Sequence, residues 1–223
     1  MRRWFWVFAL GWVGCGVNPV PEPPEPGLDG DPEADGCGAS CDGPVRLAGA
    51  ATESDRIFYV NLDGAGPPFE VAVAPDGTYQ FQSDAQPGDE VRIQPRRGSL
   101  RGEPADFLVV DAGALSLAPR PLADCFQAPA EIAVDFSSIG SYRASLSLTN
   151  QCASELTIAS IGARTPTTEF AVSAPATPLA LAPGETLSVD IAITSETIAP
   201  EEVVLIEISA PVVDRRAITV FSR

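Results

Sequence analysis

Five cysteines carry the most reactive side chains of this sequence: Cys15, Cys37, Cys41, Cys125 and Cys152. An odd number leaves one thiol without a disulfide partner, which calls for an explanation in an exported protein. If Cys15 is set aside, the other four form an even set suited to an oxidising compartment. Four cysteines allow three pairings. We expect Cys37–Cys41 and Cys125–Cys152, because each pair then lies within one segment of the chain.

Metal ligands are sparse. Cys37 and Cys41 are close in sequence, but a zinc site wants four ligands and the chain has no histidine to complete one. Carboxylates in predicted turns offer the oxygen ligands that calcium prefers: Asp63, Asp76, Asp84, Asp89 and Glu90. No complete calcium-loop motif is present, and turn formation with solubilising charge accounts for the same residues. We therefore predict no metal site and no cofactor.

Catalytic groups are equally few. The sequence has no histidine, and all 14 basic residues are arginine. The commonest general base is thus missing, together with every serine–histidine or cysteine–histidine pair. Two carboxylates can hydrolyse glycosides, and Asp84 with Asp89 is a candidate pair. Both lie in predicted turns, where acidic side chains are usually solvated, so the sequence predicts that the protein is not an enzyme.

Residues 1–14 have the pattern of an export signal. Arg2 and Arg3 precede the apolar or glycine run from Trp4 to Gly14, which is too short for a membrane-spanning helix of about 20 residues. Val13-Gly14-Cys15-Gly16 resembles the lipobox of bacterial lipoproteins, although Trp12 stands where that family usually has leucine. The resemblance implies a signal peptide over residues 1–14 and lipidation of Cys15. An ordinary signal peptide cut near Cys15, or an uncleaved anchor, is the alternative.

Residues 15–44 are predicted to be a lipidated, disordered, acidic linker rich in proline and glycine. Apolar residues are too few there to offset the entropy of ordering. The segment from Pro19 to Pro26 favours polyproline II, a semi-rigid spacer that rises about 3.1 Å per residue. The chain carries a net charge of −16, which disfavours nucleic acid and anionic headgroups. Membrane contact would therefore depend on the attached lipid.

From residue 45 onward the sequence predicts an all-β fold, with two β-sandwiches in tandem after the linker. Short apolar runs alternate with turn pairs such as Asp63-Gly64, Asp76-Gly77 and Pro87-Gly88. No stretch of ten or more residues has a convincing helical period. Strands are expected in the first domain, residues 45–122, at Val45–Leu47, Ile57–Leu62, Phe69–Val73, Thr78–Gln82, Glu90–Gln94, Phe107–Val110 and Ala114–Leu117.

The first domain has three consecutive segments that carry a family resemblance: Phe69-Glu-Val-Ala-Val, Pro75-Asp-Gly-Thr-Tyr-Gln-Phe and Pro87-Gly-Asp-Glu-Val-Arg-Ile. Their order resembles that in the carboxypeptidase regulatory or transthyretin-like domains. The resemblance implies a seven-stranded sandwich that serves as a structural or binding module. A fibronectin-type sandwich would have nearly the same pattern.

The second domain, residues 123–223, alternates clearly in Ala144-Ser-Leu-Ser-Leu and in Leu187–Ile193, as strands with one solvated face do. Val203–Ile208 is more continuously apolar, which predicts cover on both faces. Cys125 and Cys152 are expected to meet at one end of this sandwich. The domain resembles the immunoglobulin-like family that includes major sperm protein and the spindle and ciliary repeat domains. The matching positions are Phe136, Asn150, Phe170 and Pro183-Gly184-Glu185, while Ser137 departs from the usual glycine.

These features predict a non-enzymatic, lipid-anchored cell-envelope protein that presents two β-sandwich interaction modules, periplasmic or surface-exposed, to an unidentified envelope protein. Gly16 follows Cys15 in place of the aspartate that retains many lipoproteins in an inner membrane, so the outer membrane is expected. A carbohydrate- or matrix-binding adhesin is the alternative, with Tyr59 or Tyr79 as the glycan contact. A lipid-anchored hydrolase is least favoured.

Overall fold

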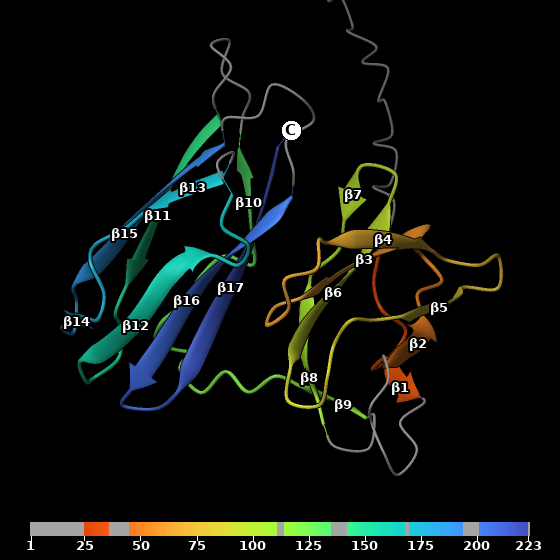
Figure 1. Cartoon of the computed structure of the whole chain (residues 1–223), viewed down its shortest axis with the longest axis horizontal. Helices are drawn as coiled ribbons and strands as arrows, with labels where there is room; N and C mark the ends of the chain where they lie inside the picture. Colours follow the sequence, from red (N-terminus) through yellow and green to blue (C-terminus); the bar gives the residue numbers. More distant parts are fainter. Residues whose placement is uncertain are drawn as a thin grey trace, which may run out of the picture.

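A computed structural model describes residues 25–35, 45–110, 114–134, 142–167, 170–193 and 201–222. These residues form strands, turns and loops without a helix, so the predicted all-β class is confirmed. Within the same ranges there is accordingly no apolar helix of membrane-spanning length. The strands form four sheets, and Figure 1 shows them as two sandwiches side by side.

The N-terminal sandwich is built from the first nine strands. They are β1 (Glu33–Asp35), β2 (Arg46–Ala50), β3 (Arg56–Asn61), β4 (Phe69–Ala72), β5 (Thr78–Gln82), β6 (Glu90–Arg97), β7 (Leu100–Arg101), β8 (Ala105–Val109) and β9 (Leu115–Leu117). One sheet has the order β4-β3-β6-β8-β9, with β7 paired to β6, and the other has the order β1-β2-β5. Their core includes Leu47, Tyr59 and Phe107. The seven-stranded expectation missed β1 and the short β7.

The C-terminal sandwich contains the remaining strands. They are β10 (Glu131–Val134), β11 (Tyr142–Thr149), β12 (Leu156–Ala163), β13 (Phe170–Ser173), β14 (Leu179–Leu181), β15 (Thr186–Ile193), β16 (Glu202–Ala210) and β17 (Asp214–Ser222). One sheet has the order β10-β17-β16-β12-β14, and the other has the order β11-β15-β13. Their core includes Leu148, Ile158 and Val189.

Alternating apolar residues place β11 and β15 as the sequence predicts. Leu146 pairs with Val189 and Leu148 with Leu187 across the antiparallel ladder, and all four side chains are buried. The side-chain period of two turns these residues to the core and the intervening polar ones to solvent. The chain therefore forms one solvated and one buried face on this sheet.

A disulfide and a buried asparagine fix the end of the C-terminal sandwich. Cys125 and Cys152 are bonded, with their Cα atoms 4.7 Å apart, as the sequence predicts. The Asn150 side chain donates to the carbonyls of Ser154 and Leu181 at 3.0 and 2.8 Å, and it accepts from the Cys152 amide at 2.9 Å. Because Asn150 is fully buried, these bonds satisfy an amide that solvent does not reach.

The prediction of a disordered linker through residue 44 is wrong for residues 33–35. Glu33–Asp35 forms β1 and pairs antiparallel with β2, while Leu28 packs against the N-terminal core. The Asp29 amide donates to the Ala50 carbonyl at 2.8 Å. The edge of β2 supplies hydrogen-bond partners that composition alone does not reveal. Cys15, Cys37 and Cys41, like Phe136 and Ser137, lie outside the described residues.

Candidate functional site

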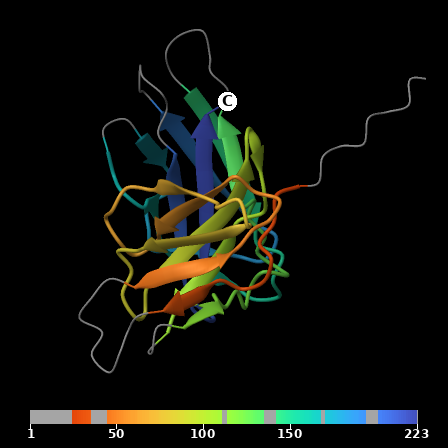
Figure 2. The same cartoon turned by 90° about the vertical axis from the view of Figure 1, so that its right-hand side faces the viewer.

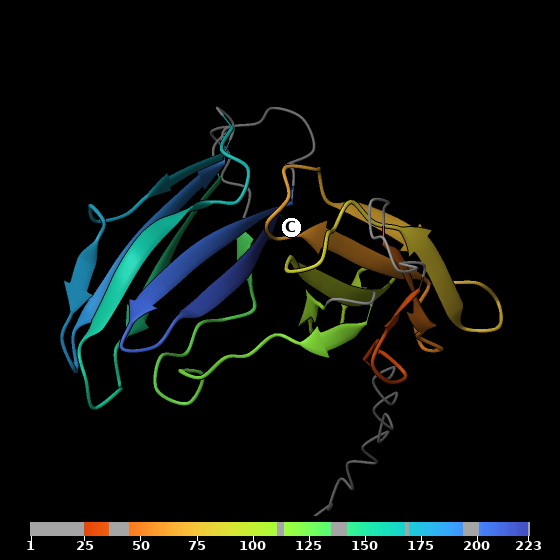
Figure 3. The ribbon, with the colours of Figure 1, turned by 60° about the horizontal axis from the view of Figure 1, so that its bottom comes forward.

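An apolar cluster joins the two sandwiches. Along β3, Tyr59 belongs to the N-terminal core, whereas Phe58 and Val60 point to the opposite face. They pack there with Val203 of β16 and with Ala217 of β17. Figure 2 shows one sandwich in front of the other, and Figure 3 shows the single segment that connects them. Both faces of β3 are thus buried by separate partners.

The β16 strand is covered in the same way. Val204, Ile206 and Ile208 belong to the C-terminal core, and Val203 belongs to the cluster between the sandwiches. The prediction that Val203–Ile208 is covered on both faces is confirmed for Val203–Ile206, where Leu205 is partly buried, but not at Glu207, whose side chain is 29% exposed. The second cover is the N-terminal sandwich.

A buried arginine crosses this interface from β6. Arg92, whose side chain is 3% exposed, makes a two-point ion pair with Asp106 at 2.7 and 3.0 Å. It also donates to the C-terminal sandwich, at 3.1 Å to the Ala130 carbonyl, 3.0 Å to the Thr219 hydroxyl and 2.6 Å to the Ala217 carbonyl. These bonds engage every nitrogen of the guanidinium, which makes Arg92 a fixed link between the two sandwiches.

A second group of ion pairs lies where β6 and β7 meet the C-terminal sandwich. Glu201 accepts from both Arg96 and Arg101 at 2.6 Å, and Arg101 also pairs with Glu131 at 2.5 Å. The Arg101 guanidinium lies 3.9 Å from the ring centroid of Phe221, a cation–π distance. Burial alone would raise the pKa of Glu201, but the hydrogen bonds and charges of Arg101 and Arg96 outweigh it and lower that pKa.

Two arginines of the C-terminal sandwich, Arg164 and Arg215, contact the N-terminal sandwich. Arg215 pairs with Asp63 at 2.7 Å. The Arg164 Nη1 donates to the carbonyls of Asn61, Gly64 and Gly66 at 3.1, 2.7 and 2.9 Å. Arg164 thereby holds the loop that follows β3, so the contact is made from both sides.

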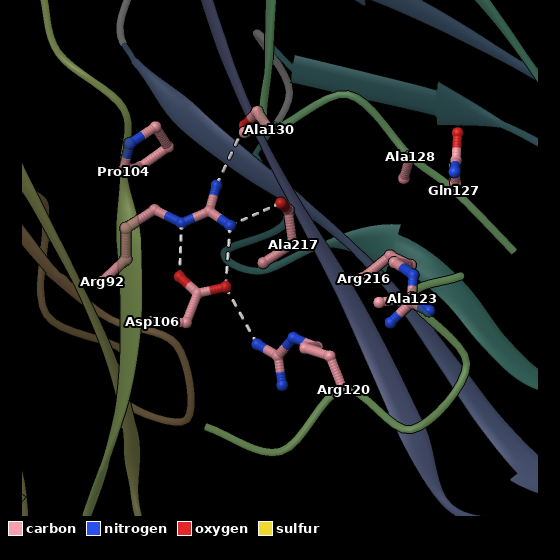
Figure 4. Close-up of a pocket in the computed structure, with 10 residues that line it drawn as sticks. All are labelled: Arg92, Pro104, Asp106, Arg120, Ala123, Gln127, Ala128, Ala130, Arg216 and Ala217. Carbon is pink, nitrogen blue, oxygen red and sulfur yellow. Dashed lines mark hydrogen bonds and ion pairs between the residues drawn. The ribbon is translucent and has the colours of Figure 1, made fainter. Parts of the chain in front are cut away.

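A pocket of about 370 Å³ lies beside Arg92, between the two sandwiches. Its lining comprises Arg92, Pro104, Asp106, Arg120, Ala123, Gln127, Ala128, Ala130, Arg216 and Ala217. Figure 4 shows Arg92 and Arg120 converging on Asp106, with Arg216 further along the pocket on β17. Three guanidiniums and one carboxylate therefore line one recess of a strongly acidic protein.

The pKa values of two carboxyl groups in this region, Asp106 and Glu90, are shifted in opposite directions. Burial would raise the pKa of Asp106, but the charge and hydrogen bonds of Arg92 and then of Arg120 lower it below its ordinary value. Glu90 also pairs with Arg120. For Glu90 burial prevails over Arg120, and the pKa of this carboxyl is raised. Arg120 thus bridges Asp106, whose pKa is lowered, and Glu90, whose pKa is raised and which lies outside the pocket lining.

The turn carboxylates do not form a cation site. Asp76 caps its own turn by accepting from the Thr78 amide and hydroxyl at 3.1 and 2.7 Å, while Asp63 and Glu90 pair with arginines. Among the residues that the structure describes, no group of three or more histidine, cysteine or acidic side chains is arranged to hold a metal ion. The calcium alternative has no ligand set within these ranges.

Asp84 and Asp89, the candidate pair for glycoside hydrolysis, accept hydrogen bonds from uncharged side chains. Asp84 accepts from the Tyr59 hydroxyl at 3.1 Å, and Asp89 accepts from the Asn61 side chain at 3.0 Å. Tyr59 and Tyr79, the expected glycan contacts, are 1% and 4% exposed. Neither tyrosine ring presents a stacking face to solvent, so that part of the adhesin alternative is wrong.

The sequence analysis did not predict the arginine interface, although the residues of β6 that form it follow a regular alternation. Alternation places Glu90, Arg92, Gln94 and Arg96 on one face of the strand. Such a face is typical of solvent exposure, yet all four residues are buried. The sequence of this face therefore does not distinguish a solvated strand from one covered by polar partners.

Comparisons with known proteins give no family assignment. No family model matches the chain, and no curated protein matches it. Among solved structures, a protein of unknown function from Porphyromonas gingivalis W83 is similar at TM-score 0.35 and 12% identity, covering 79% of this chain and 90% of that chain. Two Vibrio cholerae proteins, the VesB protease and the secreted serine protease VesC, have TM-scores of 0.34 and 0.30 at 12% identity.

The coverage of the two Vibrio structures is partial. The match to VesB covers 75% of this chain and 62% of that chain, and the match to VesC covers 76% and 46%. At these TM-scores none of the three similarities supports an assignment of fold or function.

Proposed function

We propose that this protein is a non-enzymatic, lipid-anchored component of a bacterial cell envelope that offers its two sandwiches to a protein partner as one rigid unit. Cys15 would carry the lipid, and the outer membrane would be the site of residence. The likenesses of the two domains to carboxypeptidase regulatory-like and immunoglobulin-like modules form part of the same proposal. A fold of this kind does not by itself define a function, so the proposal rests on the contacts and the cysteines described next.

The interface between the sandwiches is the main support for a rigid unit. It combines an apolar cluster around Phe58 and Val203 with ion pairs made by arginines of both sandwiches. In the proposed unit the apolar cluster holds the two sandwiches together, and the arginines fix one relative orientation because their acceptors lie in a single register. A partner can then recognise a surface composed of both.

The Cys125–Cys152 disulfide supports export. Disulfides persist in oxidising compartments and are rare in a reducing cytosol. With these two cysteines joined, Cys37 and Cys41 can pair with each other, and Cys15 remains as the odd thiol. A thiol placed directly after a signal-like segment is the acceptor that lipidation requires.

Metabolic labelling with an alkyne palmitate analogue in the native host tests the anchor. We expect labelled protein in the membrane fraction from the wild type and no label in Cys15→Ala. Cys41→Ala is the matched control, because it also removes one cysteine but leaves the lipid acceptor, so its label should persist. Label retained in Cys15→Ala, or an intact N-terminus recovered from the cytosol, would refute the lipid anchor.

In-cell crosslinking followed by purification of the envelope complex tests the partner. We expect one protein to copurify in stoichiometric amount with the wild type, and less of it with a variant in which the sandwiches are uncoupled, such as Arg92→Met. An exposed-site control, Arg46→Met, should retain the partner. A glycan that binds instead, with binding lost on changing the exposed Phe69, would favour the adhesin alternative.

A further inference from the structure

We infer that a groove on the N-terminal sandwich binds a basic segment of the protein partner, with one apolar side chain of that segment seated between lysines or arginines. The groove has a volume of about 640 Å³. The segment from Glu25 to Asp31 forms one part of its lining, and residues 103–107 with Leu117 form the rest. We call it the N-terminal groove. The inference rests on the proposed function, because it names where the proposed partner binds and the chemistry of its binding segment.

Apolar side chains make up part of the N-terminal groove. Pro26 and Phe107 are buried, and Leu28 packs against the N-terminal core. Leu117 pairs with Phe107 across the β8–β9 ladder but is 64% exposed. A single exposed leucine is ordinary, whereas an apolar recess with a polar rim is typical of a binding site for another protein. The groove can therefore bury an apolar side chain of a partner against Leu117.

Every charged residue that lines the N-terminal groove is acidic. These residues are Glu25, Asp31 and Glu103, and all three are exposed. Within the part of the chain that the structure describes, none of them takes part in an ion pair. Asp106 and Glu201 at the interface, by contrast, are paired with arginines. Unpaired charges of one sign beside apolar walls create a negative potential that attracts cations.

The occupant has to match both the apolar surface and the charge. A second copy of this chain carries a net charge of −16 and would be repelled. A polyamine would leave the apolar surface uncovered, and an uncharged apolar molecule would leave the carboxylates unmatched. A segment with one apolar side chain between basic ones meets both requirements. Burial of the apolar side chain supplies most of the affinity, because exposed ion pairs are individually weak, and the charges select the partner.

The docked segment from Glu25 to Asp31 makes the groove a preformed site. The Asp29 amide donates to the Ala50 carbonyl at 2.8 Å, and the Asp29 carboxylate accepts from the Thr52 amide at 2.6 Å. A Cβ at position 102 would overlap the Pro26 carbonyl oxygen, so Gly102 allows this segment to approach β7 closely. A partner then binds without paying the entropy of ordering this wall.

Calorimetric titration of the exported protein, purified from its native host, tests the groove. The probe is an acetylated and amidated peptide of sequence lysine-lysine-leucine-lysine-lysine. In one companion peptide serine replaces the leucine, and in another glutamate replaces each lysine. The titrations are made at about 0.15 M salt, where the Debye length of about 8 Å screens the attraction of distant charges.

The protein variants change exposed side chains, so that the fold is kept. Leu117→Ser removes the apolar contact, and Glu103→Arg reverses one charge of the rim. Val213→Ser is the matched control for the first, since Val213 is 76% exposed on the C-terminal sandwich. Glu155→Arg is the control for the second, because Glu155 is also exposed and has no ion pair among the described residues. It changes the net charge of the chain by the same amount as Glu103→Arg.

We expect saturable binding of one leucine peptide per chain and no binding of the glutamate peptide. The serine peptide should bind about tenfold more weakly, because it lacks the apolar side chain. Leu117→Ser and Glu103→Arg should each weaken the leucine peptide by about fivefold or more, and the two control variants should bind it like the wild type.

Three results would overturn the inference. They are the absence of saturable binding, equal affinity for the serine and leucine peptides, and groove variants that bind like their controls. Equal affinity would show attraction by net charge alone. If the peptide fails to bind while a protein partner still copurifies from the envelope, the groove assignment is wrong and the proposed function stands. If the peptide binds as expected and no partner copurifies, the groove assignment stands and the proposed partner is wrong.

Discussion

Replacing Arg92 by methionine should destabilise the protein far more than the same change at an exposed arginine. Arg92→Met keeps the apolar stem but removes the ion pair with Asp106 and three bonds to the C-terminal sandwich. Removing one partner of a buried ion pair costs about 3–5 kcal/mol. We expect the lower end, because Arg120 still pairs with Asp106 at 2.9 Å. The loss is a large part of a typical stability of about 5–15 kcal/mol.

Urea denaturation followed by far-ultraviolet circular dichroism measures this effect. A loss of about 3 kcal/mol lowers the midpoint by roughly 1–3 M urea. Arg46→Met is the control, since Arg46 is exposed on β2 and the described residues offer it no ion pair. A double-mutant cycle with Asp106→Leu should give a coupling energy of about 1–3 kcal/mol. A midpoint for Arg92→Met equal to that of Arg46→Met, or a coupling near zero, would show that Arg92 is not a link between the sandwiches.

Two further perturbations have a defined outcome. The pKa values of Asp63, Asp106 and Glu201 are lowered in the folded protein. Their contribution to stability is therefore complete above the ordinary pKa, 3.8 for aspartate and 4.5 for glutamate. It is lost as the pH falls through the lower pKa values of the folded state. Glu90, with a raised pKa, acts in the opposite sense on its own. We expect the urea midpoint to fall from pH 6 to pH 3, and less steeply in Arg101→Gln; parallel slopes for the two proteins would contradict the assignment to Glu201. Gly102→Ala should release the segment around Pro26, because a Cβ there would overlap the Pro26 carbonyl oxygen. Cleavage after Glu33 by a glutamate-specific protease should then be about tenfold faster or more, whereas Gly162→Ala, with open space at its Cβ, should match the wild type.

Much of the strand content was predictable because side-chain alternation is a local pattern. The strands with apolar residues at every second position, such as β11 and β15, were recognised from their own residues. Edge elements were harder. β1 contains only Glu33, Ala34 and Asp35, and the pairing that makes it a strand comes from β2. A local sequence pattern does not show which edge strand a short segment will pair with.

The interface was beyond sequence reasoning for a similar reason. Arg92 and Thr219 are 127 positions apart, and the residues next to Arg92 in the sequence do not indicate that its acceptors lie in the C-terminal sandwich. Arg101, Arg164 and Arg215 looked like ordinary solvated charges, which is the usual state of arginine. Only the folded arrangement pairs them with Glu201, with the loop after β3 and with Asp63.

The two kinds of contact at the interface have different roles. Burying charged groups costs free energy that their mutual attraction often only just offsets, so the arginines are a weak source of net stability. The apolar cluster of Phe58, Val60 and Val203 provides the main drive for association, since apolar burial is favourable and not directional. An apolar patch alone would allow several relative orientations of the two sandwiches. The guanidiniums select one of them, because each finds its acceptors in a single register. Replacing the Arg92–Asp106 pair by Met and Leu together should therefore destabilise the protein by less than the sum of the two single replacements, because neither variant side chain leaves a buried charge without its partner.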